Sequence, residues 1–250
     1  MDKQFQAIAA ECGLPESAAL QLRDAGYVVF EEPVFGLKPA QLSAAYDAAV
    51  SVADPEDVRK GSTSTRIRDF VNRGPTFDEL YLYRPLLGAC CQVLGRPFKL
   101  STMHARTLEP GVPAQSLHID FKRYDEGWPM VGFIIMVDDF RRDNGATRFV
   151  PGSHLMAQAL NDVLTDSTAD YEGQALACGR AGSLVIYNGS IWHGHTANRS
   201  ALPRRSIQGA FIRREDQSGE NLPARMLPET LTRLSDLAKY LLDLKPGDED

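Results

Sequence analysis

One histidine and one carboxylate stand two residues apart, in His118-Ile119-Asp120. Side chains on a β-strand alternate between its faces, so a strand here would point His118 and Asp120 to the same side. Leu117, Ile119 and Phe121 would then point to an opposite, apolar side. Two histidines and one carboxylate with open coordination positions form the site of non-haem iron(II) oxygenases. The pair therefore predicts two iron ligands and requires a further histidine.

A second block, residues 182–206, contains the remaining groups. It contains His193 and His195, and Arg204 and Arg205 stand near its end. The two histidines are two residues apart, so a strand would present both to one face, and alternation does not choose the ligand between them. An arginine is expected because 2-oxoglutarate, when it chelates iron, leaves a distal carboxylate. The planar fork of arginine binds such a group through two N–H donors.

The two arginines differ in the face that each would occupy. On a strand that begins at residue 204, Arg204, Ser206 and Gln208 share one polar face, which suits the lining of a metal cavity. Arg205 falls on the apolar face and would reach solvent at the strand end. We therefore expect Arg204 to anchor 2-oxoglutarate, with Ser206 beside it. Gln115 leads into the His-Ile-Asp segment and is a further candidate for contact with cosubstrate or substrate.

Other polar and aromatic residues have plainer interpretations. His154 follows a Pro-Gly-Ser turn and is expected to stabilise that turn, and His104 is expected to form hydrogen bonds beside the pocket. Tyr187 and Trp192 fit the core and the pocket wall equally well. The variable pocket walls should come from segments 55–76 and 121–130 and from the C-terminal region, because loops on a rigid framework often carry specificity. The candidates there are Arg66, Arg68, Phe121, Lys122, Tyr124 and Trp128.

The elements that would position these groups are helical first and β-rich later. Helical spacing and stop signals predict helices at 16–25, 38–52, 78–94 and 229–243, with a strand at 27–31 and a loop at 55–76. From about residue 97, turn signals separate short strands at 98–107, 115–121, 131–138, 147–150, 183–187, 190–196 and 205–213. This pattern predicts a mainly β fold, a sandwich or jelly roll, with flanking helices. The acidic tail, residues 247–250, is expected to be disordered.

Length and charge narrow the classes of partner. The 250 residues suit one domain, and the net charge of −6 argues against a general nucleic-acid or membrane-surface binder. A small-molecule partner is expected, while nothing indicates the oligomeric state. The first residues do not form a secretory signal, and the four cysteines form no CxxC pair, so reduced thiols in the cytoplasm are expected.

Four segments together resemble the phytanoyl-CoA dioxygenase family. They are LRDAGYVVFEE (22–32), EPGVPAQSLHID (109–120), DNGATRFVPGSH (143–154) and WHGHTANRSALPRR (192–205), and the resemblance extends over about residues 16–213. It implies a double-stranded β-helix, or jelly roll, with its core at about 97–213, after a helical part at 1–96, in a single oxygenase domain. It also implies that His118, Asp120 and His193 hold iron(II), that Arg204 anchors 2-oxoglutarate and that dioxygen is consumed. His195 stands where relatives often carry a small polar residue beside the cosubstrate.

The implied reaction is hydroxylation of an unactivated C–H bond in a small organic substrate, with release of succinate and carbon dioxide. Halogenation is disfavoured, because it usually requires glycine or alanine in place of Asp120. Cyclisation, desaturation and epimerisation use the same ligands and stay open. A jelly-roll binding module without turnover would need neither the complete ligand set nor the arginine. The substrate itself is not indicated.

Overall fold

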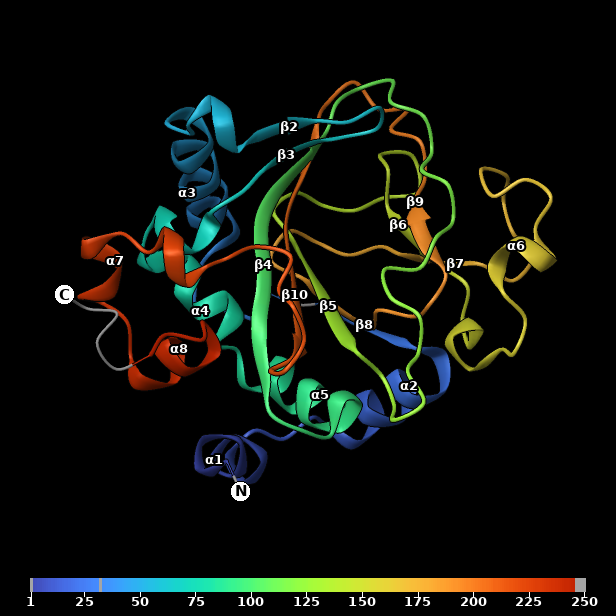
Figure 1. Ribbon diagram of the computed structural model, residues 1–250. Helices are drawn as coiled ribbons and strands as arrows, with labels where there is room; N and C mark the ends of the chain where they lie inside the picture. The colour runs from blue at the N-terminus through green and yellow to red at the C-terminus, as the bar shows by residue number, and fades with distance from the viewer. Residues whose placement is uncertain (1, 32, 246–250) are drawn as a thin grey trace.

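The structure of the protein is a computed structural model that describes residues 2–31 and 33–245. Two antiparallel sheets face each other, with helices beside the larger one (Figure 1). The helices are α1 (Lys3–Glu11), α2 (Glu16–Ala25), α3 (Pro39–Ser51), α4 (Asp78–Tyr81), α5 (Arg84–Leu94), α6 (Leu160–Val163), α7 (Pro228–Leu231) and α8 (Asp236–Leu241). The strands are β1 (Tyr27–Phe30), β2 (Val58–Lys60), β3 (Thr65–Ile67), β4 (Phe98–Leu108), β5 (Met130–Met136), β6 (Thr147–Phe149), β7 (Ala175–Ala177), β8 (Leu184–Asn188), β9 (His193–His195) and β10 (Arg204–Arg213).

The strand order places distant parts of the sequence together. The larger sheet has the order β1-β8-β5-β10-β4-β3-β2, and the smaller sheet has the order β7-β6-β9. β10 lies between β5 and β4 and pairs with both along its length. The N-terminal strand β1 pairs with β8, far along the chain. The expected mainly β architecture with flanking helices is therefore present.

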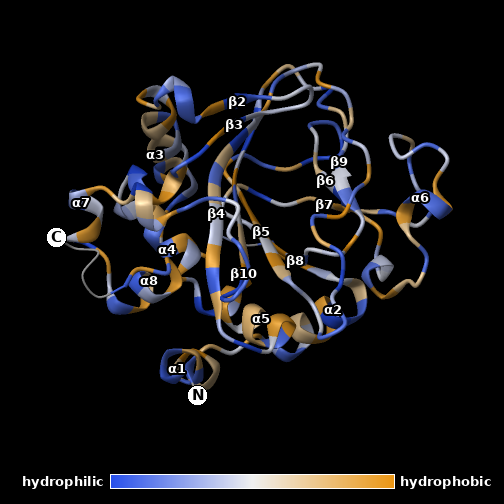
Figure 2. Cartoon of the chain, viewed as in Figure 1, coloured by the Kyte–Doolittle hydropathy of each residue, from blue (hydrophilic) through white to orange (hydrophobic). Residues whose placement is uncertain are grey.

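The larger sheet has apolar side chains on both faces. On β5, Phe133 and Ile135 pack with the helices, whereas Ile134 lies in the cluster between the two sheets. Every residue of β5 is buried, because helices cover one face and the smaller sheet covers the other. Figure 2 shows hydrophobic stretches along α5 and along the neighbouring strand β5. The space between the sheets is where a polar site must be built into apolar surroundings.

The end of α2 shows how a local signal fixes an element. Gly26 has φ 84°, and its N–H donates to the carbonyl of Leu22 at 3.1 Å, which ends the helix in a left-handed turn. A Cβ at Gly26 would lie 2.6 Å from Nδ1 of His154, so a larger residue does not fit. Nε2 of His154 lies 3.1 Å from the carbonyl oxygen of Arg23. His154 thus links the Pro-Gly-Ser turn to the helix end.

Two expected helices are each divided into two shorter ones. The expected helix 78–94 breaks into α4 and α5, because Pro85 occupies the start of α5 and lacks the N–H that a continuous helix would use. The expected helix 229–243 breaks into α7 and α8, because the Ser235 side chain accepts the N–H of Ala238 and begins a new helix. The expected loop 55–76 contains the hairpin β2–β3. Residues 247–250 lie outside the described residues.

The prediction of a strand at 115–121 was wrong. Only His118 forms a β-bridge there, and its partner is His193. The N–H of Leu117 donates to the carbonyl of Ser167, and the N–H of Asp120 donates to that of Gly189. These partners lie in loops, so the segment is held by backbone hydrogen bonds without a continuous ladder.

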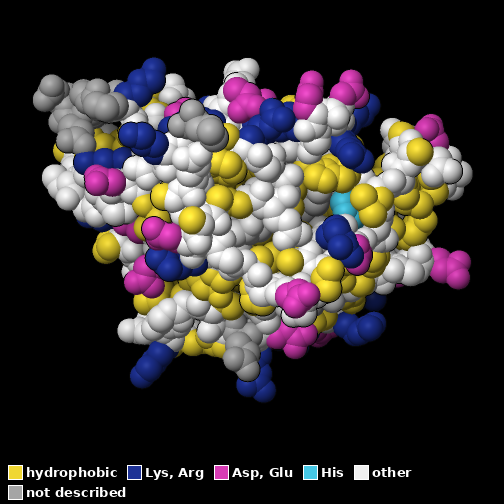
Figure 3. Space-filling view, turned by 90° about the horizontal axis from the view of Figure 1, so that it is seen from below, with side chains coloured by type: hydrophobic (Ala, Val, Ile, Leu, Met, Phe, Trp, Pro, Cys, Tyr) yellow, Lys and Arg dark blue, Asp and Glu magenta, His cyan; other side chains and the backbone are white. Residues whose placement is uncertain are grey.

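The surface carries charges of both signs. Figure 3 shows acidic and basic side chains interspersed with hydrophobic ones on the face that it presents. Among residues 2–31 and 33–245, no helix is long and apolar enough to cross a membrane.

Candidate functional site

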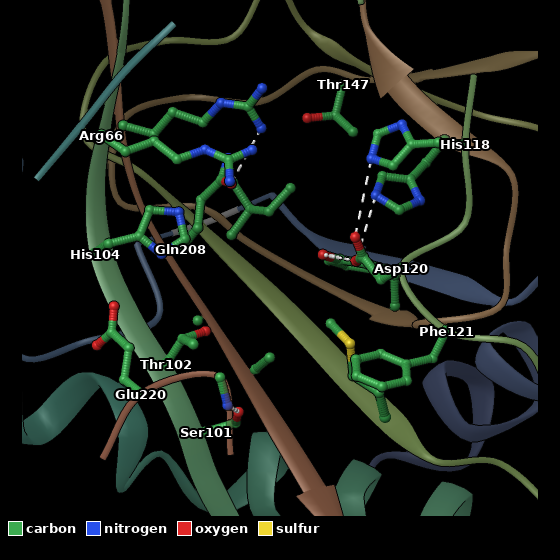
Figure 4. A pocket seen from close by; sticks show the side chains of 18 of the residues that line it. Arg66, Ser101, Thr102, His104, His118, Asp120, Phe121, Thr147, Gln208 and Glu220 are labelled. Atoms are coloured by element: carbon green, nitrogen blue, oxygen red, sulfur yellow. Dashed lines mark hydrogen bonds and ion pairs between the residues drawn. The ribbon is translucent and has the colours of Figure 1, made fainter. Parts of the chain in front are cut away.

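Three side chains with metal-binding atoms meet between the sheets. In His118, Asp120 and His193 the nearest donor atoms all lie within 4.8 Å of one another. Nε2 of His118 is 3.9 Å from Oδ1 of Asp120, and Nε2 of His193 is 3.5 Å from Oδ2. Figure 4 shows the imidazole of His118 directed at the Asp120 carboxylate. The structure thus brings together the three residues that the sequence suggested as iron ligands.

The backbone fixes how each imidazole is presented. Nδ1 of His118 lies 3.0 Å from the carbonyl oxygen of Ser116, and Nδ1 of His193 lies 2.9 Å from that of Ile191. A carbonyl can only accept a hydrogen bond, so each Nδ1 carries the proton and each Nε2 keeps its lone pair for a metal. Burial, helped by the neighbouring His193, lowers the pKa of His118. The uncharged imidazole that metal binding requires is therefore favoured.

Tyr187 orients the carboxylate. Its hydroxyl on β8 donates to Oδ2 of Asp120 at 3.0 Å, and burial with the nearby Asp120 charge raises the pKa of Tyr187. The phenol consequently stays protonated as a donor. The space for its ring exists because Gly132 on the adjacent strand β5 has no Cβ, which would lie 2.1 Å from the ring. Tyr187 therefore lines the pocket and also packs in an apolar core cluster, so it has both roles that the sequence left open.

We expect Tyr187→Phe to weaken iron(II) binding by about 10- to 100-fold, the usual effect of losing an outer hydrogen bond to a ligand. The ring would still fill its space, so the fold should be retained. Tyr27→Phe is the matched control, since Tyr27 stacks on Phe149 in the same apolar cluster and does not line the cavity. Iron titration of the folded proteins measures both. Equal iron affinities for the two variants would show that the Tyr187 hydroxyl does not support the metal centre.

His193 and His195 occupy different positions although both are buried on β9. His195 lies outside the group of three donors; its Nδ1 is 2.8 Å from the carbonyl oxygen of Thr196, and its buried Nε2 has no hydrogen-bond partner among the described residues. It lines the same cavity. Between them, Gly194 permits close packing, because a Cβ there would lie 2.9 Å from the carbonyl oxygen of Gln115.

Arg204 reaches the same cavity from β10. It is 1% exposed, and it donates to Oγ of Ser206 at 3.2 Å and to the carbonyl of Gly145 at 2.7 Å. Its Nε has no partner, and no carboxylate pairs with it among residues 2–31 and 33–245. Burial and the nearby Arg106 lower its pKa. A buried cation without a counter-ion is costly, so the position calls for an anion.

The other predicted residues of this region divide between the cavity and its surroundings. Arg205 lies on the opposite face and pairs with Asp138 at 2.6 Å and with Asp47 at 2.6 Å, so it does not simply reach solvent as expected. Ser206 is fully buried behind Arg204 and does not line the cavity. Gln115 does line it.

The cavity has a volume of about 460 Å³, and its lining has a polar part and an apolar part. The apolar wall contains Phe121, Met130, Ile134, Ala210 and Ile212. Of the residues suggested for the variable walls, Arg66, Arg68 and Phe121 line it, whereas Lys122, Tyr124 and Trp128 do not. The C-terminal contribution comes from Gln217, Gly219 and Glu220, before the last helices. Phe121 was expected on the apolar side opposite His118, but it turns into the cavity because its segment is not a regular strand.

Two buried arginines were missed by sequence reasoning. Arg106 lines the cavity from β4, two residues after His104, which also lines it. Strand alternation from His104 would have been a signal for Arg106. Arg148 is 0% exposed and donates to the carbonyls of Gln115 at 2.8 Å and Ser167 at 3.1 Å. It thereby holds the loop against which the His118 segment is bonded, and no sequence pattern indicates this.

Comparisons with known proteins agree with this architecture. Residues 22–206 match the sequence profile described as phytanoyl-CoA dioxygenase (PhyH). The chain is similar to the dioxygenase cdmA of Talaromyces verruculosus, with 37% identity over 134 residues, 50% of this chain and 41% of that relative. It is also similar to the dioxygenase aneA of Aspergillus aculeatus, with 30% identity over 192 residues, 70% of this chain and 62% of that relative. The chain thus spans less than two thirds of the length of these two relatives.

Solved structures support the predicted fold. HygX from Streptomyces hygroscopicus, with nickel and 2-oxoglutarate bound, has a TM-score of 0.69 at 16% identity and covers 83% of this chain and 91% of its own. SnoK, a carbocyclase of nogalamycin biosynthesis described as non-haem and α-ketoglutarate dependent, has a TM-score of 0.66 at 20% identity and covers 91% of this chain and 93% of its own. The predicted jelly roll is confirmed. From the profile match over residues 22–206, the chain belongs to the phytanoyl-CoA dioxygenase family.

Proposed function

We propose that the protein is an iron(II)- and 2-oxoglutarate-dependent dioxygenase that hydroxylates an unactivated C–H bond of a small organic substrate, with release of succinate and carbon dioxide. One observation carries the proposal. His118, Asp120 and His193 converge beside a buried arginine, Arg204, in one cavity. The donor set suits iron(II), and the unpaired cation suits the distal carboxylate of 2-oxoglutarate. Membership of the family supports the same chemistry.

The residues fit these groups in detail. Nε2 of His118, Nε2 of His193 and the Asp120 carboxylate would hold the metal, with Tyr187 orienting the carboxylate. Arg204 would bind the 5-carboxylate of 2-oxoglutarate. The unpartnered Nε2 of His195 and the side chain of Gln115 lie in the same cavity and would contact the cosubstrate. When bound, iron(II) and 2-oxoglutarate supply the activation of dioxygen and the oxidative decarboxylation.

The remaining protein groups control the substrate and the solvent. The apolar wall formed by Phe121, Met130 and Ile134 would hold a carbon skeleton next to Asp120 and keep water away from the reacting bond. The protein's part is thus to position the target, to orient the ligands and to exclude water, while the metal and its cosubstrate provide the oxidant.

A substrate screen tests the reaction type. Purified protein is incubated with iron(II), 2-oxoglutarate and candidate small molecules, and succinate and product mass are measured. Hydroxylation adds the mass of one oxygen atom to the product. Cyclisation and desaturation would instead remove two hydrogens, and epimerisation would leave the mass unchanged, so those alternatives are distinguished by the same experiment. A folded, iron-loaded protein that never forms succinate would favour a non-catalytic jelly-roll binding protein.

A further inference from the structure

Three arginines form a row across neighbouring strands on one side of the cavity. Arg59 on β2 lies opposite Arg66 on β3, and Arg66 lies opposite Arg106 on β4. All three line the cavity. We call Arg59, Arg66 and Arg106 the arginine row. Side chains directly opposite each other on paired strands share a face at close range, and like charges in such pairs destabilise the sheet. Arg106 is buried, whereas Arg59 and Arg66 are exposed, so solvent screens part of this repulsion and an anion against the row would relieve the rest.

The described residues do not neutralise this row. All three guanidinium nitrogens of Arg106 donate to uncharged side-chain oxygens. These belong to Ser64 at 3.1 Å, Gln208 at 3.3 Å and Gln115 at 3.0 Å. Arg66 forms no hydrogen bond or ion pair within residues 2–31 and 33–245. Burial, together with Arg66 and Arg106, lowers the pKa of His104 to about 3, so this histidine is uncharged and does not change the charge of the row.

The acidic residues of the cavity do not neutralise the arginine row. They are Asp120, which belongs to the metal group, and Glu220. Figure 4 shows Glu220 on the far side of His104 from the Arg66 guanidinium. Burial raises the pKa of Glu220 to about 7, so this carboxyl is only partly ionised near neutral pH. Arg68, a further arginine of the wall, is already paired with Asp57 at 3.7 Å.

The cosubstrate does not supply the missing anion either. This step rests on the proposed function. Iron(II), the Asp120 carboxylate, the two carboxylates of 2-oxoglutarate and the Arg204 guanidinium would together carry no net charge. The positive charge of the arginine row remains, next to a cavity of about 460 Å³ with an apolar wall. A cavity of this size can hold a small organic molecule, and its remaining charge selects a negatively charged one.

We infer that the substrate is a small organic acid, whose carboxylate is received by the arginine row, chiefly by Arg66, and whose carbon skeleton lies against Phe121, Met130 and Ile134. Figure 4 shows the side chain of Arg66 extending into the cavity toward the side that holds Thr147 and His118. A carboxylate there would accept charge-assisted hydrogen bonds and relieve the repulsion within the row. Its skeleton would then extend toward the metal group.

The test uses the protein loaded with nickel(II) and saturating 2-oxoglutarate, so that no turnover occurs. The probes are phenylacetate and its uncharged analogue phenylacetamide, titrated by calorimetry. We expect phenylacetate to bind at least about tenfold more tightly than phenylacetamide, since a hydrogen bond to a charged group is worth this much. Arg66→Gln should remove most of that preference while its affinity for 2-oxoglutarate stays unchanged. Arg180→Gln, the same change at an exposed arginine outside the cavity, should behave as the wild type.

The outcomes separate the inference from the proposed function. A wild type that binds 2-oxoglutarate but shows no preference for phenylacetate overturns the inference alone. So does an Arg66→Gln variant that keeps the preference. Loss of 2-oxoglutarate affinity in Arg66→Gln would assign Arg66 to the cosubstrate and overturn the inference as well. A folded, nickel-loaded wild type that fails to bind 2-oxoglutarate would instead contradict the proposed function, and the inference would fall with it.

Discussion

Replacing His193 by alanine should leave the purified protein without iron and remove nearly all turnover. Its Nε2 lies 3.5 Å from Oδ2 of Asp120, and no fourth side chain joins this group of donors among residues 2–31 and 33–245. His195→Ala should retain iron, because its imidazole lies outside that group although it lines the cavity. The second variant should instead change the affinity for 2-oxoglutarate or the coupling between succinate release and product formation.

Iron content and the circular dichroism of both folded variants provide the measurement. The two residues are the same type, both are buried, and they lie on the same short strand β9, so each variant controls for the other. If His195→Ala comes out metal-free and His193→Ala keeps its iron, the assignment of the two histidines is reversed.

Arg204→Ala should raise the apparent Michaelis constant for 2-oxoglutarate by a factor of ~10 or more, because a hydrogen bond to a charged group is worth ~1.5–3 kcal/mol. Arg204→Lys should recover part of the affinity, since it keeps the charge but loses the planar fork. The buried guanidinium has no counter-ion among the described residues, so its removal should not break an ion pair.

Arg205→Ala is the matched control. It removes the ion pairs with Asp138 and Asp47 on the other face of β10 and should lower the melting temperature while the Michaelis constant for 2-oxoglutarate stays unchanged. Steady-state kinetics at saturating substrate, together with thermal unfolding, separate the two effects. A rise of the constant in Arg205→Ala but not in Arg204→Ala would mean that the cosubstrate anchor lies on the other face.

Short sequence patterns predicted the parts of the fold that depend on residues close together in the chain. Helix α2 ends at Gly26, as expected, because glycine takes the left-handed turn without strain. On β10, alternation correctly separated Arg204, which faces the cavity, from Ile207, which packs against the helices. A strand with both faces fixed by strong contacts leaves little freedom in its register.

Parts that depend on distant partners were not predictable in this way. The segment around His118 looked like a strand, but only some of its backbone N–H groups donate to β9, at His193 and His195. Those of Leu117 and Asp120 donate to the carbonyls of Ser167 and Gly189, which no sequence pattern pairs with the segment. The hairpin β2–β3 has only three residues in each strand and lies in a segment rich in charge and turn residues, so its pairing with β4 was not indicated.

The same distinction between neighbouring and distant residues applies to the candidate site. The histidines and the carboxylate could be suggested because iron chemistry restricts the residue types and because the resemblance supplied their order. Arg59 and Arg66 lie in the hairpin β2–β3, about forty residues before Arg106 on β4, and the three meet only through strand pairing. Each arginine alone resembles an ordinary solvated charge. Their common feature, a row on one wall of the cavity, exists only in the folded chain.

The most direct test of the central claim is the decarboxylation of 2-oxoglutarate by the wild type and by Asp120→Ala, with carbon dioxide and succinate measured together. Asp120 is decisive because it is the carboxylate that both histidines approach. The wild type should release the two products in equal amounts, only when iron(II) and dioxygen are both present, and folded Asp120→Ala should release neither above background. Equal product formation by the variant and the wild type would contradict an iron centre held by His118, Asp120 and His193.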